Sequence, residues 1–248
     1  MAATGIGAGD LATAGFAGSY LGTAILWAVV VGALLKYIIT EGLARWQLAT
    51  GTTLMEGVVT RIGKPAGWVF MAYLLLWSFI VGSALMSACG VTFHALLPVF
   101  ENAAHGKVFF GVVASLAGAA MVLMGGYPLF ARIMQLCIGL MFATVVVTAA
   151  LQWPGTGDVM SELLIPSIPD VDGGLAWTVA LMGGVGGTVT VLCYGYWIRE
   201  EGRTGEEHLP MCRLDLTAAY AVTALFGIAM VIIGSSVEIE GRGATLIV

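Results

Sequence analysis

The sequence predicts an all-α protein that crosses a membrane several times. Hydrophobic residues make up 59% of its 248 residues and charged residues only 10%, and its mean hydropathy is +0.95. A soluble domain carries about 25% charged residues, which keep its surface in contact with water. The apolar runs are much longer than the alternating segments of about ten residues that form membrane β-barrels. Helices are the other structure in which all backbone hydrogen bonds can form within a bilayer. The sequence therefore predicts a bundle of membrane-spanning helices.

Seven apolar segments are candidate helices, since a membrane span needs about 20 mostly apolar residues. The first is short and follows the glycine-rich string Gly5–Gly9, and the other six are full spans. The predicted helices are Asp10–Tyr20, Gly22–Ala44, Trp68–Leu97, Val108–Met124, Ile133–Leu151, Leu175–Ile198 and Leu216–Val237.

Basic residues predict the orientation, because lysine and arginine concentrate in cytoplasmic loops. If the N-terminus is cytoplasmic, the inner loops hold seven basic residues and the outer loops hold two. The inner residues are Arg45, Arg61, Lys64, Arg132, Arg199, Arg203 and Arg213, and the outer ones are Lys107 and Arg242. The segment 152–174 has four acidic residues and no basic residue. We therefore expect a multi-pass protein of the cell (inner) membrane, with a cytoplasmic N-terminus and an acidic extracytoplasmic loop at 152–174.

Two glycine-rich segments interrupt the helical pattern. The string Gly5–Gly9 precedes the first helix, and Gly183–Thr188 lies within the sixth. Glycine costs about 1 kcal/mol relative to alanine inside a helix, so each cluster favours local unwinding. Interruptions at corresponding positions of two halves are typical of transporters built from inverted repeats. The same Gly-x-x-x-Gly spacing also allows two helices to pack closely without binding a ligand.

Asp10 is the leading candidate for a cation ligand, because an ionisable residue inside a membrane is costly and usually functional. It directly follows the first glycine string, where an unwound backbone would expose carbonyl oxygens. Such hard oxygen ligands suit magnesium, calcium or manganese. Asp10 could instead be a helix N-cap, a position that aspartate favours. At the second interruption, the hydroxyl of Thr188 could add an oxygen or satisfy freed backbone groups.

Two further ionisable residues, Lys36 and Glu41, lie in the second helix. Glu41 and Arg45 have the i,i+4 spacing of a structural ion pair on a helix surface. Glu41 is also a candidate for gating. Lys36 is a candidate for charge balance or for pairing with another helix, and the sequence does not choose between these roles.

The remaining residues show no catalytic arrangement. The sequence has no Ser/His/Asp, HExxH or paired-carboxylate pattern, so we do not expect an enzyme. The four cysteines have no CxxC spacing, and we interpret them as reduced packing residues. No basic patch with interleaved aromatic residues indicates nucleic acid. The expected partners are the lipid bilayer and a divalent cation as substrate, no resident cofactor is expected, and the oligomeric state stays open.

Three segments resemble a known family. They are Gly9–Thr13 (GDLAT), Leu26–Trp27 and Arg45–Gly51 (RWQLATG), and they resemble the NRAMP (natural resistance-associated macrophage protein) family of divalent-metal transporters. The resemblance implies part of a LeuT-type fold of five plus five helices in inverted repeats, with helices 1 and 6 broken around the metal. The first repeat would occupy 1–151, with helix 1 lacking its inner half, and the second would begin at 175–248 with helices 6 and 7.

The resemblance also implies a set of metal ligands, which is altered here. The family has Asp-Pro-Gly-Asn in the first break, whereas this chain has Gly7 to Asp10, which leaves Asp10 as the charged ligand beside backbone groups such as those of Gly7. The family's Met-Pro-His corresponds to residues 187–189, so Gly187 and Thr188 replace the methionine sulfur that favours soft metals. A carbonyl ligand maps near Gly184. If the substrate is a cation, this departure from the family favours magnesium or manganese over iron.

Other departures from the family concern coupling and length. The third predicted helix, 68–97, has no acidic residue, whereas the family carries acids there for proton movement, so we do not expect proton coupling of the usual kind. The fold needs ten helices and this chain supplies about six and a half, so we expect a fragment or a shortened chain. Two alternatives stay open: an amino-acid or other small-solute carrier of the same fold, and an inactive truncated membrane protein.

Overall fold

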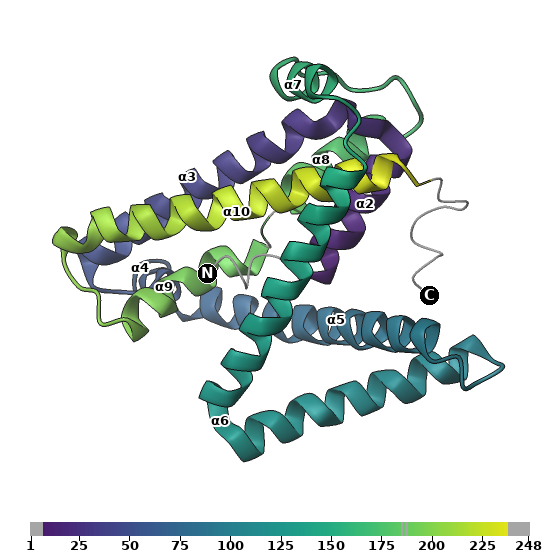
Figure 1. The fold of residues 1–248 in the computed structure, drawn as a ribbon. Helices are drawn as coiled ribbons and strands as arrows, with labels where there is room; N and C mark the ends of the chain where they lie inside the picture. The colour runs from purple at the N-terminus through teal and green to yellow at the C-terminus, as the bar shows by residue number, and fades with distance from the viewer. Residues whose placement is uncertain (1–6, 185, 187, 238–248) are drawn as a thin grey trace. The chain divides into compact units, whose positions relative to one another are not determined.

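The computed structural model describes residues 7–184, 186 and 188–237. In this part of the chain every regular element is a helix, and five segments are long and apolar enough to cross a membrane. The elements are α2 (Ala8–Leu21), the 3₁₀ turn η1 (Gly22–Ile25), α3 (Leu26–Thr50), α4 (Leu54–Arg61), α5 (Lys64–Leu96), α6 (Ala103–Leu151), α7 (Thr156–Leu164), α8 (Gly174–Gly184), α9 (Thr188–Glu200), the 3₁₀ turn η2 (Glu206–His208) and α10 (Leu209–Ser235). The α-helices are labelled in Figure 1. The predicted all-α polytopic membrane protein is confirmed.

The helices form two compact units. The larger unit contains α2 to α4, the end of α6 from Leu140 onward, and α7 to α10. The second unit contains α5 and α6 as far as Gly139. The main hydrophobic core and every residue predicted for a cation site belong to the larger unit.

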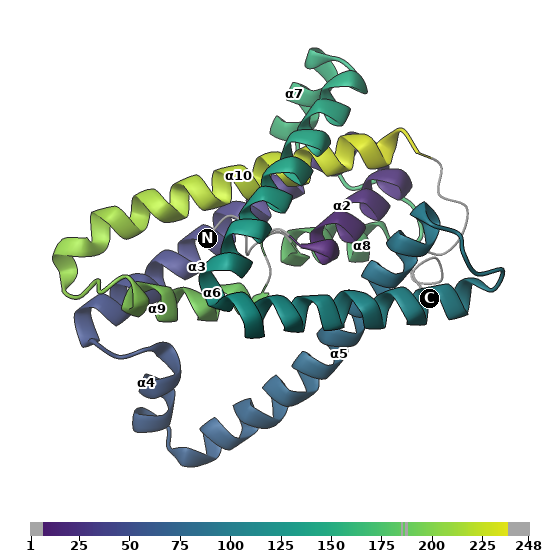
Figure 2. The ribbon, with the colours of Figure 1, turned by 60° about the horizontal axis from the view of Figure 1, so that its bottom comes forward.

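In the larger unit, α10 runs along both α2 and α3 (Figure 1, Figure 2). Glycines allow the helices to approach closely. A Cβ atom added at Gly18 of α2 would overlap the backbone of Val231, and one added at Gly234 of α10 would overlap the backbone of Gly15. Small residues at such interfaces let membrane helices gain van der Waals contact along their backbones. The contact buries Ala14 and Ala17 and positions the start of α2 against α10.

The first predicted helices have nearly the expected limits, but α3 continues to Thr50 rather than ending at Ala44. Gly51 ends it with a φ of 71°, in the left-handed conformation, and donates its N–H to the Gln47 carbonyl at 2.7 Å. This is the usual glycine stop of an α-helix. The extra turns bury Gln47 and Leu48, so packing extends the helix past the polar residues that suggested an end.

The helix α6 is a continuous run of 49 residues, where the sequence predicted two separate helices. A straight helix of this length would measure about 74 Å, more than twice the thickness of the hydrocarbon core, about 30 Å. Two segments within it, Ala103–Met124 and Arg132–Leu151, are each long and apolar enough to span. The two predicted spans are therefore present, and helical hydrogen bonding continues between them.

The sixth predicted helix is interrupted. The helix α8 ends at Gly184 and α9 begins at Thr188, with Gly186 in a turn between them. Gly186 has a φ of +76°, a backbone conformation that glycine adopts without steric cost. The predicted interruption within Gly183–Thr188 is thus observed, although Val185 and Gly187 lie outside the described residues. Residues 1–6, which include the start of the first glycine-rich string, lie outside the described residues as well.

The acidic segment 152–174 contains the short helix α7 and is attached to the start of α3 and the end of α2. The Tyr20 hydroxyl donates to the Asp172 carbonyl at 2.8 Å, and the Trp27 indole N–H donates to the Ser167 carbonyl at 2.8 Å. Val159 of α7 is buried in the main core. The segment therefore packs on the larger unit rather than extending from it as a free loop.

The second unit is a pair of apolar helices. Glycines again permit close contact, because a Cβ atom at Gly111 of α6 would lie 2.8 Å from the Met86 carbonyl oxygen of α5. Phe93 of α5 stacks on Phe110 of α6 with ring centroids 6.2 Å apart. Most of the apolar side chains of α5 are exposed, as expected of a helix that faces lipid.

Candidate functional site

The carboxylate of Asp10 connects the start of α2 to the interruption between α8 and α9. One oxygen, Oδ2, accepts a hydrogen bond from the Gly7 amide at 2.9 Å. The other, Oδ1, accepts one from the Gly186 amide at 3.0 Å. Gly7 and Gly186 therefore donate amides from the two glycine-rich segments that the sequence singled out. The site is built where these two segments meet.

Local structure explains how Asp10 reaches the Gly7 amide. The helix α2 begins at Ala8 with Gly7 as its N-cap, which puts Asp10 at the third helical position. A carboxylate there can reach back to the N-cap amide, as the acidic residue of a capping box does. Its negative charge also complements the positive end of the helix dipole. Asp10 is thus not the N-cap itself, and the N-cap interpretation is corrected in this respect.

The turn at Gly186 orients the second amide, the Gly186 N–H, toward Asp10. A Cβ atom at this position would lie 3.2 Å from Cε1 of Tyr220 and 3.5 Å from Cγ2 of Thr223. Both the positive φ and the lack of room favour glycine. The turn rests against α10 and presents its N–H to Asp10. Gly186 was not among the predicted ligands, although it belongs to the predicted glycine-rich interruption.

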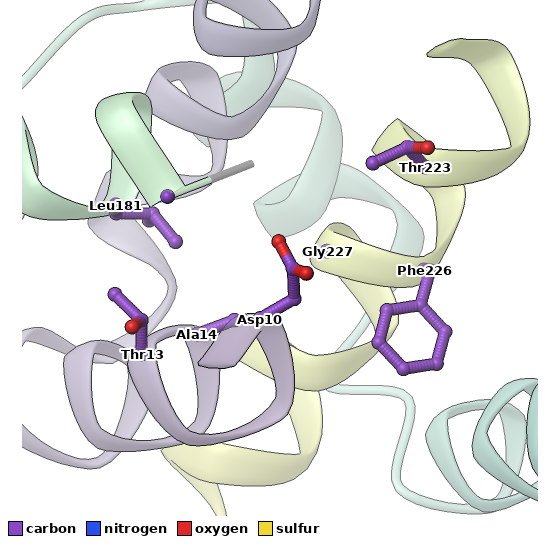
Figure 3. A pocket seen from close by; sticks show the side chains of 8 residues that line it. Asp10, Thr13, Ala14, Leu181, Thr223, Phe226 and Gly227 are labelled. Atoms are coloured by element: carbon purple, nitrogen blue, oxygen red, sulfur yellow. The ribbon is translucent and has the colours of Figure 1, made fainter. Parts of the chain in front are cut away.

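A small cavity lies beside the carboxylate. Its volume is about 10 Å³, about the room that one water molecule needs. Figure 3 shows Asp10 pointing from α2 toward the space between the end of α8 and α10. Residues from α2, α8 and α10 surround the cavity: Asp10, Thr13, Ala14, Leu181, Gly184, Thr223, Phe226 and Gly227.

Oxygen atoms are the donors available to a cation here. Asp10 supplies the charge, and Thr13, which carries a hydroxyl, lines the cavity and lies against Gly184 with its methyl group nearest. The carbonyls of the last turn of α8 lack partners within their own helix. No group of three or more His, Cys, Asp or Glu residues gathers in the described part of the chain. A bound cation would therefore rely on one carboxylate together with backbone and hydroxyl oxygens.

The predicted site residues have different outcomes. Gly7 contributes an amide to Asp10, and Gly184 lines the cavity. Gly187 lies outside the described residues; Thr188 is the first residue of α9, but its side chain lies outside them too. The structure adds Thr13 and Thr223 to the lining. Sequence reasoning missed both, because a threonine in an apolar helix gives no signal until its neighbours are known.

Glu41 is held in an ion pair network away from the cavity lining. It accepts hydrogen bonds from Arg45 at 2.8 Å and from Arg213 of α10 at 2.8 Å. The predicted i,i+4 pair with Arg45 is present, whereas the Arg213 contact spans 172 residues and had no sequence signal. The ion pair between Glu41 and Arg213 therefore connects α3 to the first part of α10.

Lys36 is buried in α3, one turn before Thr40. The residue is only 8% exposed, and its Nζ has no hydrogen-bond partner among the described residues. Lys36 and Asp10 form no direct ion pair among the described residues, although Thr40, one turn after Lys36, bonds to Tyr220, which contacts the turn at Gly186. The charge-balance interpretation of Lys36 stays a prediction.

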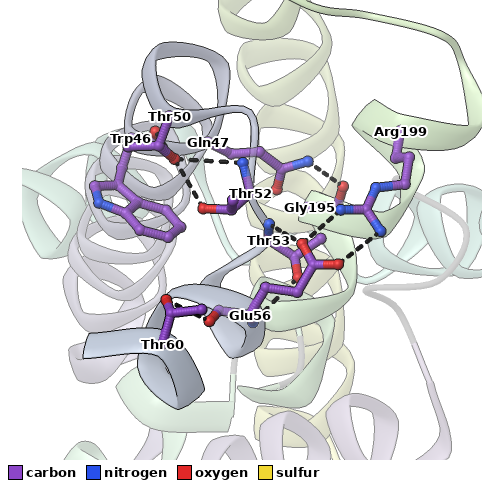
Figure 4. A network of polar contacts seen from close by, with 9 residues as sticks. All are labelled: Trp46, Gln47, Thr50, Thr52, Thr53, Glu56, Thr60, Gly195 and Arg199. Carbon is purple, nitrogen blue, oxygen red and sulfur yellow. Dashed lines mark hydrogen bonds and ion pairs between the residues drawn. The ribbon is translucent and has the colours of Figure 1, made fainter. Parts of the chain in front are cut away.

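A polar network at the far end of α3 joins α4 to α9 (Figure 4). Glu56 accepts the Thr53 amide at 2.8 Å, completing a capping box for α4, and it forms a two-pronged pair with Arg199 of α9 at 3.1 and 2.6 Å. The Arg199 guanidinium lowers the pKa of Glu56 to about 2. Gln47 donates to the Gly195 carbonyl at 2.6 Å. The T-x-x-E spacing of Thr53 and Glu56 is a recognisable capping signal, but Arg199 as a partner is not.

Comparison with known proteins agrees with these features. Residues 1–244 match the family model described as natural resistance-associated macrophage protein-like. A relative from Chromohalobacter salexigens, called divalent metal cation transporter MntH, is 27% identical over 166 residues, which cover 65% of this chain and 37% of the relative. The chain thus spans well under half the length of that relative. Since the family model covers nearly the whole chain and the described helices include several membrane spans, this protein is an integral membrane protein that belongs to the NRAMP family.

Proposed function

We propose that this chain takes part in the transport of a divalent metal cation and that Asp10 is its charged ligand. The observation that carries the proposal is the position of the Asp10 carboxylate, which accepts amides from the start of α2 and from the turn between α8 and α9. Membership of the NRAMP family and the name of the MntH relative support the same substrate class. We also propose the LeuT-type arrangement, the cell (inner) membrane and a cytoplasmic N-terminus.

The hydrogen bonds of Asp10 leave lone pairs on its carboxylate to which a cation could bind. Each oxygen of the Asp10 carboxylate has two lone pairs. On each oxygen, one lone pair accepts a backbone amide of this chain. A cation would use the remaining lone pairs or displace the Gly186 amide, which sits on the turn rather than on a regular helix. Displacement would link ligand binding to movement of α8 relative to α9. Such movement at an interrupted helix supplies a physical basis for alternating access.

The donor set favours a hard cation. The cavity lining has carboxylate, hydroxyl and backbone oxygens, and its described side chains include no sulfur or imidazole. Magnesium and manganese suit oxygen ligands, whereas softer transition metals gain from sulfur or nitrogen. We therefore propose magnesium or manganese as substrate in preference to iron, with Asp10, Thr13 and backbone groups near Gly7, Gly184, Gly187 and Thr188 around the cation.

The test measures Mn²⁺ binding by the 248-residue chain in lipid nanodiscs. Binding is detected as a loss of the electron paramagnetic resonance signal of free Mn²⁺. Asp10→Asn should weaken binding at least about tenfold, since a ligand charge is lost. Asp170→Asn, on the acidic segment 152–174, is the matched control and should bind as the wild type does. Competition with Mg²⁺ and Fe²⁺ then ranks the cations, and uptake into liposomes follows transport itself.

Equal Mn²⁺ binding by the wild type and Asp10→Asn would reject Asp10 as the ligand. Displacement of Mn²⁺ by amino acids would favour the small-solute carrier instead. That carrier would need free helix-end amides for the carboxylate of its substrate. Here the amides of Gly7 and Gly186 already bind Asp10, which argues for the cation.

A further inference from the structure

Lys36 lies on the face of α3 that packs against the interruption between α8 and α9. Gly32, one turn before it, approaches α8 so closely that an added Cβ atom would lie 2.6 Å from the Met182 carbonyl oxygen. Thr40, one turn after it, hydrogen-bonds the Tyr220 hydroxyl at 2.8 Å. Tyr220 in turn contacts the turn at Gly186. Residues four apart share a helix face, so Lys36 lies between a contact with the end of α8 and a contact that leads to the turn at Gly186.

Within the described part of the chain, the ammonium group of Lys36 lacks the contacts that a buried charge requires. Lys36 is 8% exposed, and Nζ has no hydrogen-bond partner among the described residues. Burying an unpaired charge is expensive. Asp10 forms no direct ion pair with Lys36 among the described residues, but it binds the same turn at Gly186 that the Thr40 and Tyr220 contacts reach. A positive charge that neutralises Asp10 therefore raises the cost of keeping Lys36 charged.

Several of the other ionisable groups around α3 have partners of their own. Glu41, on the same helix, is bound to Arg45 and Arg213. On α10, Asp215 is paired with Arg203, and the hydroxyl of Tyr220 is bonded to Thr40. Further ionisable residues on the elements that contact α3 are Tyr37 on α3 itself, Asp158 and Glu162 on α7, Cys193, Tyr194, Tyr196, Arg199 and Glu200 on α9, Glu206, Glu207 and His208 on η2, and Cys212 on α10.

We propose that Lys36 is a built-in counter-cation of the substrate site, and that a divalent cation at Asp10 and a proton on Lys36 exclude each other. The inference rests on the proposed function of Asp10. Binding then follows a balanced exchange. The divalent cation takes its place beside the Asp10 carboxylate, an N–H bond of the Lys36 ammonium breaks, the amine keeps the electron pair, and the proton leaves to water.

This exchange gives the chain a means of proton coupling that does not depend on acids in α5. The helix α5 has no aspartate or glutamate along Lys64–Leu96. With Lys36 charged, the site already has one positive charge for the single negative charge of Asp10. Two further positive charges would be strongly repelled in a medium of low dielectric constant. Loss of the Lys36 proton removes that repulsion, so cation entry is exchanged for one proton.

The experiment measures protons released when Mn²⁺ binds to the full chain in nanodiscs, by calorimetry in two buffers with different ionisation enthalpies. The wild type should release about one proton per cation, and its affinity should rise by up to about tenfold per pH unit, as one linked proton requires. Lys36→Gln and Lys36→Met should bind Mn²⁺ more tightly, without proton release. Lys36→Arg keeps its charge and should bind at least about tenfold more weakly. Lys64→Gln, at an exposed position, is the control and should match the wild type.

The outcomes separate this inference from the proposed function. Mn²⁺ binding that requires Asp10 but releases the same number of protons in the wild type and in both neutral Lys36 variants would overturn the role of Lys36 alone. Absence of Mn²⁺ binding by the wild type would overturn both proposals. The proton count of the wild type is itself a test that needs no variant to fold, and a count near zero would overturn the exchange.

Discussion

Oδ1 of Asp10 accepts a hydrogen bond from the backbone amide of Gly186 at 3.0 Å, across 176 residues of sequence. Through this contact α2, the first helix in the described part of the chain, touches the turn that interrupts the sixth predicted helix. A carboxylate that binds backbone amides from both segments fixes their relative position. The contact is therefore the structural element through which a change at Asp10 would be transmitted to α8 and α9.

Replacing Gly186 by alanine should destabilise the turn. The residue has a φ of +76°, and an added Cβ would lie 3.2 Å from Tyr220. Strained conformations of this kind cost about 1–3 kcal/mol each. We expect a lower thermal unfolding temperature and weaker Mn²⁺ binding. Gly42→Ala in α3, where nothing lies within 4 Å of the added atom, should leave both properties unchanged or raise the stability slightly. Equal effects of the two variants would contradict the role of the turn.

A side chain at Gly18 should disrupt the contact between α2 and α10. An added Cβ would overlap the backbone of Val231, which cannot move aside as a side chain can. Overpacking typically costs about 1–3 kcal/mol, and we expect Gly18→Ala to lower the unfolding temperature in detergent. Gly9→Ala on the same helix adds a Cβ with no atom within 4 Å. Gly9→Ala should therefore be at least as stable as the wild type, and similar stabilities of the two variants would argue against the close approach of α2 and α10.

Substitution Glu41→Gln tests whether this residue acts in stability or in gating. It leaves Arg45 and Arg213 without their shared carboxylate, and losing charge-assisted hydrogen bonds costs about 1–3 kcal/mol. We expect a lower unfolding temperature with Mn²⁺ affinity unchanged within about twofold, because Glu41 does not line the cavity. A change in liposome uptake at unaltered affinity and stability would instead support gating. Glu207→Gln, at an exposed position, is the control.

The contact between Glu56 and Arg199 should respond to acid. The pKa of Glu56 is about 2 in the folded protein, below its usual value of 4.5. A lowered pKa contributes stability that is present above about pH 4.5 and is lost as the pH falls toward 2. The unfolding temperatures of the wild type and Glu56→Gln should therefore differ at neutral pH and converge in acid. Because both side chains are exposed to solvent, added salt should reduce the difference at neutral pH, and a difference that persists at pH 2 would contradict this assignment.

The sequence predicted much of the helical arrangement because spans are set by local composition. Long apolar runs such as those in α5 and α10 have few stable alternatives in a bilayer. The interruption near Gly186 was also predictable, since clustered glycines weaken a helix wherever it packs. The run from 103 to 151 was less predictable, because it continues as one helix where two were expected. Local composition does not say whether a helix ends between two spans.

The candidate site was predictable only in part. Asp10 stands out as an acid in an apolar chain, and the glycines around it indicate open backbone. Its actual partners, the amides of Gly7 and Gly186, depend on the meeting of two distant segments. The same is true of Arg213 beside Glu41 and of Arg199 beside Glu56. No periodicity within one helix carries information on such pairs.

The sequence by itself determined that the chain crosses a membrane with helices, that its sixth helix is interrupted, and that Asp10 is the acid beside the glycine-rich start. These features depend on the free energy of transferring residues to a bilayer and on backbone propensity, both of which are local. Only the tertiary structure decided that Asp10 binds Gly186, that Glu41 joins α3 to α10, and that Lys36 is buried beside the interruption without a described partner. Such pairings depend on how helices approach one another, and that approach is decided by the packing of small residues across the whole unit.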